Sequence, residues 1–135
     1  MSYSIQKIEG IGPAYGSKLR KAGIRTTRDF LKHCCDAKGR KQAAKGTGFS
    51  TKQLLEWANL ADLMRITGIG PQYSELLEAA GVDTVKELCK RNAENVAAKM
   101  KQVNARKRVT RTVPSASMVQ QWIVKAKRMK PLITH

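Results

Sequence analysis

Residues 8–34 of the chain, IEGIGPAYGSKLRKAGIRTTRDFLKHC, recur 58 positions later as residues 66–92, ITGIGPQYSELLEAAGVDTVKELCKRN. At this offset 11 of the 27 paired positions are identical, including both GIGP turns. The similarity resumes farther along, where Ser50 and Trp57 match Ser115 and Trp122 at an offset of 65. Such self-similarity indicates a duplicated structural unit. We therefore expect one domain over residues 1–135, with repeat 1 over about residues 1–65 and repeat 2 over about residues 66–135.

Each repeat carries the start and stop signals of a short α-helix directly after its GIGP turn. Pro13 and Pro71 stand where a first helical residue belongs, because proline has a suitable fixed φ and the missing N–H is expendable there. Gly23 and Gly81 follow about ten residues later, at positions typical of helix-ending glycines. The two GIGP turns are therefore predicted to lead into equivalent helices.

Further helices follow in both repeats. The capping-box pairs that start the next helices are Thr26 with Asp29, and Thr84 with Glu87. Apolar residues at helical spacing continue over 50–64 and over 119–129, and they place Trp57 and Trp122 on buried faces. No segment alternates with the period of a strand. The sequence predicts an all-α fold in which two pseudo-symmetric repeats share one hydrophobic core.

The composition indicates a polyanionic partner. The chain has 26 Lys and Arg against 10 Asp and Glu, which gives a net charge of +16. A small soluble domain usually carries a net charge of about 2–8 in magnitude. Because the excess charge repels itself, its retention favours a nucleic acid or another polyanion as partner.

The GIGP turns resemble helix-hairpin-helix motifs, which bind DNA backbones without reading the base sequence. The two glycines of each turn can adopt positive φ, and the amides at the start of the next helix suit a phosphate. Ile11 and Ile69 are expected to point into the core. The paired motifs resemble a tandem helix-hairpin-helix domain, and over nearly its full length the chain is similar to the DUF4332 family. This resemblance implies that the backbones of Gly10, Ile11 and Gly12, and equally of Gly68, Ile69 and Gly70, face a phosphate.

The charges that follow the two turns differ, so we expect the two hairpins to differ in function. Basic residues follow the first hairpin, whereas Glu75, Glu78 and Asp83 follow the second. We therefore expect the first hairpin to bind the backbone and the second, Gly68 to Gly70, to be mainly structural. The basic side chains predicted to extend the contact of the first hairpin are Lys18, Arg20, Lys21, Arg25, Lys38, Arg40, Lys41, Lys45, Lys99, Lys101, Arg106, Lys107, Arg108 and Arg111.

Catalytic chemistry is not expected. The carboxylates are few and scattered, no serine or cysteine relay accompanies His33 or His135, and no phosphate-binding loop of the Walker type is present. The cysteines Cys34, Cys35 and Cys89 lack the spacing of a zinc site. We expect no enzyme activity, no metal and no cofactor. Aromatic residues make up 5% of the chain, so stacking on single strands is not the expected mode, and Tyr15 and Tyr73 are expected to be packing residues.

Two functional hypotheses remain. The first is a non-sequence-specific nucleic-acid-binding protein, with DNA favoured over RNA. The alternative is a non-catalytic protein-interaction adaptor in a nucleic-acid or ribosome-associated complex, which should expose an apolar patch. The sequence contains no apolar run long enough to span a membrane, and its first residues lack a signal core. We expect a cytoplasmic protein, with association with the nucleoid as one option and no membrane partner. The sequence leaves the oligomeric state open.

Overall fold

The computed structural model describes residues 2–135, and within them it confirms the all-α class. This part of the chain contains eight α-helices, one short 3-10 helix and no β-strand. The helices are η1 (Ile5–Lys7), α1 (Pro13–Lys21), α2 (Thr27–Cys34), α3 (Ala37–Thr47), α4 (Thr51–Leu63), α5 (Pro71–Ala79), α6 (Val85–Leu88), α7 (Ala93–Lys107) and α8 (Ala116–Lys127).

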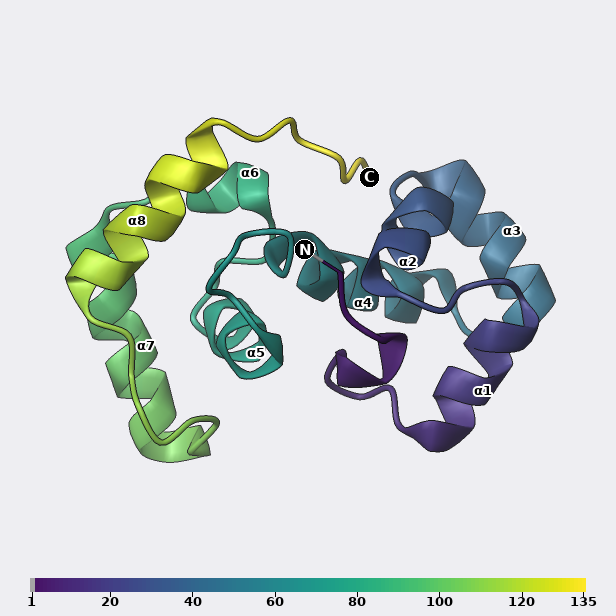
Figure 1. The fold of residues 1–135 in the computed structure, drawn as a ribbon, viewed down its shortest axis with the longest axis horizontal. Coiled ribbons are helices and arrows are strands. Elements are labelled where there is room, and N and C mark those ends of the chain that lie inside the picture. Colours follow the sequence, from purple (N-terminus) through teal and green to yellow (C-terminus); the bar gives the residue numbers. More distant parts are fainter. Residues whose placement is uncertain (1) are drawn as a thin grey trace.

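The helices form two lobes with α4 between them (Figure 1). Helices η1, α1, α2 and α3 make up the N-terminal lobe, in which α2 and α3 both pack against α4. Helices α5 to α8 make up the C-terminal lobe, in which α7 packs against both α5 and α8. Helix α4 also contacts α5, so it connects the two lobes.

The buried apolar side chains form two clusters, which differs from the single shared core that the sequence predicted. The N-terminal core includes Leu19, Phe30 and Trp57. The C-terminal core includes Leu77 and Trp122. Helix α4 supplies side chains to both, because Leu63 belongs to the C-terminal core while the other buried apolar side chains of this helix pack in the N-terminal one. Each repeat therefore has its own core, and the two cores are joined through one helix.

The predicted helix boundaries are confirmed in both repeats. Pro13 and Pro71 are the first residues of α1 and α5. Gly23 and Gly81, just after these helices, have φ values of 87° and 92°. Thr26 forms the predicted capping box with Asp29. Thr84 accepts a hydrogen bond from the Glu87 amide, but the Glu87 side chain pairs with Arg91 instead of completing a box.

The two GIGP segments adopt the same local structure. Ile11 and Ile69 are buried as predicted, and the amide of each donates to the carbonyl three residues before it. Gly10 and Gly68 have φ values of 90° and 103°, which favour glycine. A Cβ atom at Gly10 would lie 3.2 Å from Nε1 of the buried Trp57, and one at Gly68 would lie 3.0 Å from Nε1 of Trp122. Each tryptophan is therefore a core residue, as predicted, and it supports the turn of its own repeat.

The C-terminal residues 130–135 return from α8 to the N-terminal lobe (Figure 1). Arg65 donates a hydrogen bond to the Lys130 carbonyl at 3.1 Å. The amide of Thr134 donates to the Cys35 carbonyl at 2.8 Å, and Ile133 packs against the N-terminal core. These contacts hold the two lobes together on the side where α2 lies.

Candidate nucleic-acid interface

Helices α1 and α5 begin without a side-chain cap. Their N-cap residues are Gly12 and Gly70, and neither can supply a capping oxygen. The other six α-helices are capped by the side chains of Thr26, Asp36, Ser50, Thr84, Asn92 and Ser115. Because a helix start leaves amides without intrahelical acceptors, α1 and α5 present free N–H groups at their positive dipole ends.

Neither Gly12 nor Gly70 is required by the fold. Their φ values are −84° and −91°, which any residue can adopt. A Cβ atom at Gly12 would have no neighbour within 4 Å, and one at Gly70 would meet only the Tyr3 hydroxyl at 3.8 Å. The expectation that both glycines of each turn take positive φ is therefore wrong for the second glycine. The absence of a side chain at these two positions leaves room for a ligand to approach the helix amides.

The second hairpin lines an open groove of about 980 Å³ that also contains basic side chains. Gly68 and Gly70 form one side, and the segment after α7 forms the other with Arg108 and Arg111. Lys7, from the N-terminal lobe, is the third cationic side chain in the groove. Three cations therefore surround the turn that the sequence places next to acidic residues. We call this site the basic groove.

The segment that carries the two arginines has a defined conformation. Arg108 ends α7 with a left-handed backbone at φ 51°, and its amide donates to the Asn104 carbonyl. The Asn104 side chain donates to the Thr110 carbonyl at 2.9 Å and accepts from the Thr110 amide at 3.0 Å. Tyr73 donates to the Thr112 carbonyl at 3.3 Å, which joins the segment to α5. These bonds hold the segment facing the second hairpin.

The first hairpin borders an acidic cleft instead. Gly10 lines this cleft together with the carboxylates of Glu9, Glu56, Glu75 and Glu78, and Lys107 is the one cation there. Burial raises the pKa of Glu75, and the nearby Glu9 and Glu78 raise it further. A phosphate placed beside Gly10 would therefore meet several carboxylates, which disfavours it.

The basic residues predicted around the first hairpin lie elsewhere in the N-terminal lobe. Lys18, Arg20 and Lys21 belong to the last turn of α1, away from its free amides. Arg20 also donates a 2.8 Å hydrogen bond to the Gln6 side chain. Arg25 is exposed beyond the end of α1. These basic residues are therefore close to the first hairpin in the sequence but do not lie at it in the structure.

The prediction that Arg40 binds nucleic acid is wrong. Its exposed fraction is 4%, and its guanidinium donates to the carbonyls of Cys34 at 3.0 Å and Thr134 at 2.6 Å. Through these bonds the buried guanidinium connects the C-terminal residues to the N-terminal lobe. A phosphate in solution cannot reach it.

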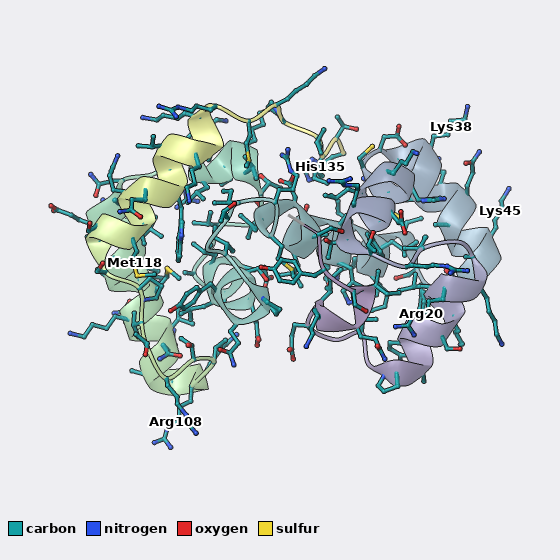
Figure 2. The ribbon with its side chains drawn as sticks, viewed as in Figure 1. Arg20, Lys38, Lys45, Arg108, Met118 and His135 are labelled. Atoms are coloured by element: carbon teal, nitrogen blue, oxygen red, sulfur yellow. The ribbon has the colours of Figure 1, made fainter. Side chains whose placement is uncertain are left out.

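The remaining predicted basic residues are exposed but do not form one surface. Lys38, Lys41 and Lys45 are exposed on α3. In Figure 2, Lys38 and Lys45 lie at the opposite end of the molecule from Arg108. The other predicted residues of the C-terminal lobe, Lys99, Lys101, Arg106 and Lys107, are exposed on α7 but lie outside the basic groove. The expected extension of one contact surface across both basic runs is therefore not present.

Lys7 is the residue of the basic groove that sequence reasoning missed. It precedes the repeated segment and is followed by the acidic Glu9, so no basic run marked it. Lys125 was missed as well, and its ammonium donates to the Thr67 carbonyl at 3.0 Å, directly before the second hairpin. Lys7 could have been found only by predicting that its segment lies beside the second hairpin, which no local sequence pattern indicates.

Other chemistry is limited in the part of the chain that the structure describes. Among residues 2–135 no group of three or more His, Cys, Asp or Glu side chains could hold a metal ion. Burial raises the pKa of the Cys34 thiol to about 11, which keeps it protonated. Within the same residues, no helix is both long and apolar enough to cross a membrane.

The chain belongs to the family described as a domain of unknown function, DUF4332, whose match covers residues 9–129. This range includes both GIGP segments and ends just after α8. No curated protein and no solved structure matches the chain.

Proposed function

We propose that this protein binds the sugar–phosphate backbone of nucleic acid, with DNA favoured over RNA, without reading the base sequence. The observation that carries this proposal is the basic groove, where three cations surround an uncapped helix start. Backbone amides at a helix N-terminus and Lys or Arg side chains are the groups that bind phosphates in such interfaces. The net charge of +16 adds a long-range attraction to any nucleic acid.

In this proposal the two GIGP segments are helix-hairpin-helix motifs, and the second one makes the main phosphate contact. This assignment reverses the roles expected from the sequence, because Lys7, Arg108 and Arg111 lie at the second hairpin and the acidic cleft lies at the first. Glu75 and Glu78, which suggested a structural role for the second hairpin, line the acidic cleft rather than the basic groove.

The alternative role as an adaptor has less support. Among the described residues, the exposed large apolar side chains are Tyr15, Val124 and Leu132. They come from α1, α8 and the C-terminal segment, whereas a protein-docking surface needs a contiguous apolar patch.

The proposal is tested by measuring binding to a labelled duplex over a range of salt concentrations. If about six phosphates are neutralised, log K should fall against log salt with a slope of roughly −5. Replacing Arg108 and Arg111 together with alanine should make the slope shallower by about 2. Replacing Lys38 and Lys45 with alanine removes the same charge from the other end of the molecule and should leave the slope almost unchanged.

Two results would contradict the proposal. Binding that does not depend on salt would exclude an electrostatic contact with phosphates. If the two double variants lost equal affinity for the duplex, the binding would reflect general attraction to a basic protein rather than a contact in the basic groove. Circular dichroism of each variant controls for folding.

A further inference from the structure

Tyr15 is exposed to an unusual degree for an aromatic residue in this molecule. Its exposed fraction is 46%, and its hydroxyl makes no hydrogen bond within residues 2–135. The equivalent Tyr73 is partly buried, packs against Trp122 at 5.5 Å between ring centroids, and bonds to the Thr112 carbonyl. The sequence prediction that both tyrosines are packing residues therefore describes Tyr73 better than Tyr15.

The Tyr15 ring contacts two other aromatic rings. Its centroid lies 5.1 Å from that of Phe49, in an edge-to-face arrangement, and 6.0 Å from that of the buried Trp57. Phe49 and Trp57 are themselves in edge-to-face contact at 4.9 Å. A ring held in this way loses little conformational freedom when a second flat group stacks on it.

A cation lies beside this aromatic cluster. The Lys18 ammonium lies 5.7 Å from the centroid of the Phe49 ring, one helical turn after Tyr15, and the Lys18 side chain is exposed. An exposed ring next to a lysine suits a group that combines a flat π-system with a negative charge. A nucleotide has both, because each base is joined through its sugar to a phosphate.

We infer that Tyr15 is a stacking platform for an unpaired nucleobase, with Lys18 attracting the adjoining phosphate. This inference rests on the proposed binding of nucleic acid and extends it to single-stranded segments. A base inside a duplex keeps its faces covered by its neighbours, so it cannot stack on Tyr15. The two repeats then divide the ligand: the basic groove holds the backbone, and the first repeat holds an unstacked base.

The test compares a single-stranded thymidine oligonucleotide with a duplex of equal length, using wild type, Tyr15→Leu and Tyr15→Phe. Leucine keeps the apolar contact with Phe49 but removes the aromatic ring, whereas phenylalanine keeps the ring and removes only the hydroxyl. Tyr15→Leu should weaken single-strand binding by about 5- to 150-fold, the range for losing one base–aromatic stack. Tyr15→Phe should bind within about twofold of wild type, and duplex binding should not change in either variant.

The inference is supported if Tyr15→Leu loses affinity for the single strand while Tyr15→Phe keeps it. Unchanged single-strand binding by Tyr15→Leu overturns it, and so does an equal loss on single strand and duplex, because Tyr15 would then only support the hairpin. Neither result affects the proposed function if the duplex still shows salt-dependent binding that needs Arg108 and Arg111. A wild-type protein that binds neither form overturns both proposals.

A measurement on the wild type covers the case in which Tyr15→Leu does not fold. A single strand carrying 5-bromouracil is irradiated in complex with the protein, and the cross-linked peptide is identified by mass spectrometry. The inference expects a cross-link at Tyr15. Cross-links confined to other parts of the chain overturn it.

Discussion

Arg40 donates a 2.6 Å hydrogen bond to the carbonyl oxygen of Thr134, which lies 94 residues later in the chain. The same guanidinium donates to the Cys34 carbonyl at 3.0 Å. One buried cation thus joins the end of α2 to the C-terminal segment.

The first prediction is that Arg40→Ala destabilises the protein by about 3 kcal/mol, because it removes two charged hydrogen bonds and leaves two carbonyl oxygens without their donor. Urea unfolding measures this change. Lys41→Ala, at an exposed neighbouring position, should change stability by no more than about 0.5 kcal/mol. A loss of duplex affinity by folded Arg40→Ala, larger than that of Lys41→Ala, would contradict the structural role given to this arginine.

The second prediction concerns two glycines inside α3. A Cβ atom at Gly39 would clash with the His33 carbonyl oxygen, whereas one at Gly46 would have no neighbour within 4 Å. Gly39→Ala should therefore destabilise the protein by about 2 kcal/mol, because α2 and α3 must move apart. Gly46→Ala should stabilise it by about 0.5–1 kcal/mol through helix propensity alone. Thermal unfolding of the pair decides this, and equal shifts of the same sign would contradict it.

The third prediction separates binding from stability at the second hairpin. In Gly70→Ser, the new hydroxyl can cap α5 by accepting from its first amides, as Ser50 and Ser115 do for α4 and α8. Stability should rise by a few tenths of a kcal/mol. Affinity for a duplex should fall, because the capped amides no longer bind phosphate. Gly12→Ser is the matched control at the first hairpin and should affect affinity less. A loss that is equal at both hairpins would contradict the assignment of the main contact to the second.

The fourth prediction is a pH dependence at the capping box of α2. Hydrogen bonds from the Arg25 and Thr26 backbone amides lower the pKa of Asp29 below its usual value of 3.8. Because the folded state has the lower pKa, the stabilisation is complete above the unfolded pKa and is lost as the pH falls through the folded one. Asp29→Ala should therefore be less stable than wild type at pH 7, by about 1 kcal/mol for a lost cap. This difference should shrink as the pH falls below about 4. Urea unfolding at several pH values measures it, and a difference that grows in acid would contradict the mechanism.

The helices could be predicted from the sequence because their signals are local. Pro13, Thr26 and Gly23 act on their own turns of the chain, and the structure places each where the sequence predicted it. Because the sequence is duplicated, the same signals also predicted the equivalent helices of the second repeat. The shared core was predicted wrongly, because helical periodicity indicates which face is buried but not which other helix covers it.

The candidate site was harder to predict because its charges come from distant parts of the chain. Lys7 and Arg108 meet at one groove although nearly the whole of both repeats lies between them. Lys18 and Lys21 follow the first hairpin in sequence, yet a helix carries them away from its start. Arg40 looks like one more member of a basic run, and only its depth in the fold reveals its structural role.

The bond between Arg40 and Thr134 also determines the order in which the protein can be completed during synthesis. At about 5–20 residues per second, residue 134 is made about 5–19 seconds after Arg40. During this interval the N-terminal lobe lacks the carbonyl that binds its buried guanidinium. The N-terminal lobe therefore cannot reach its final structure until the residues after α8 have been synthesised.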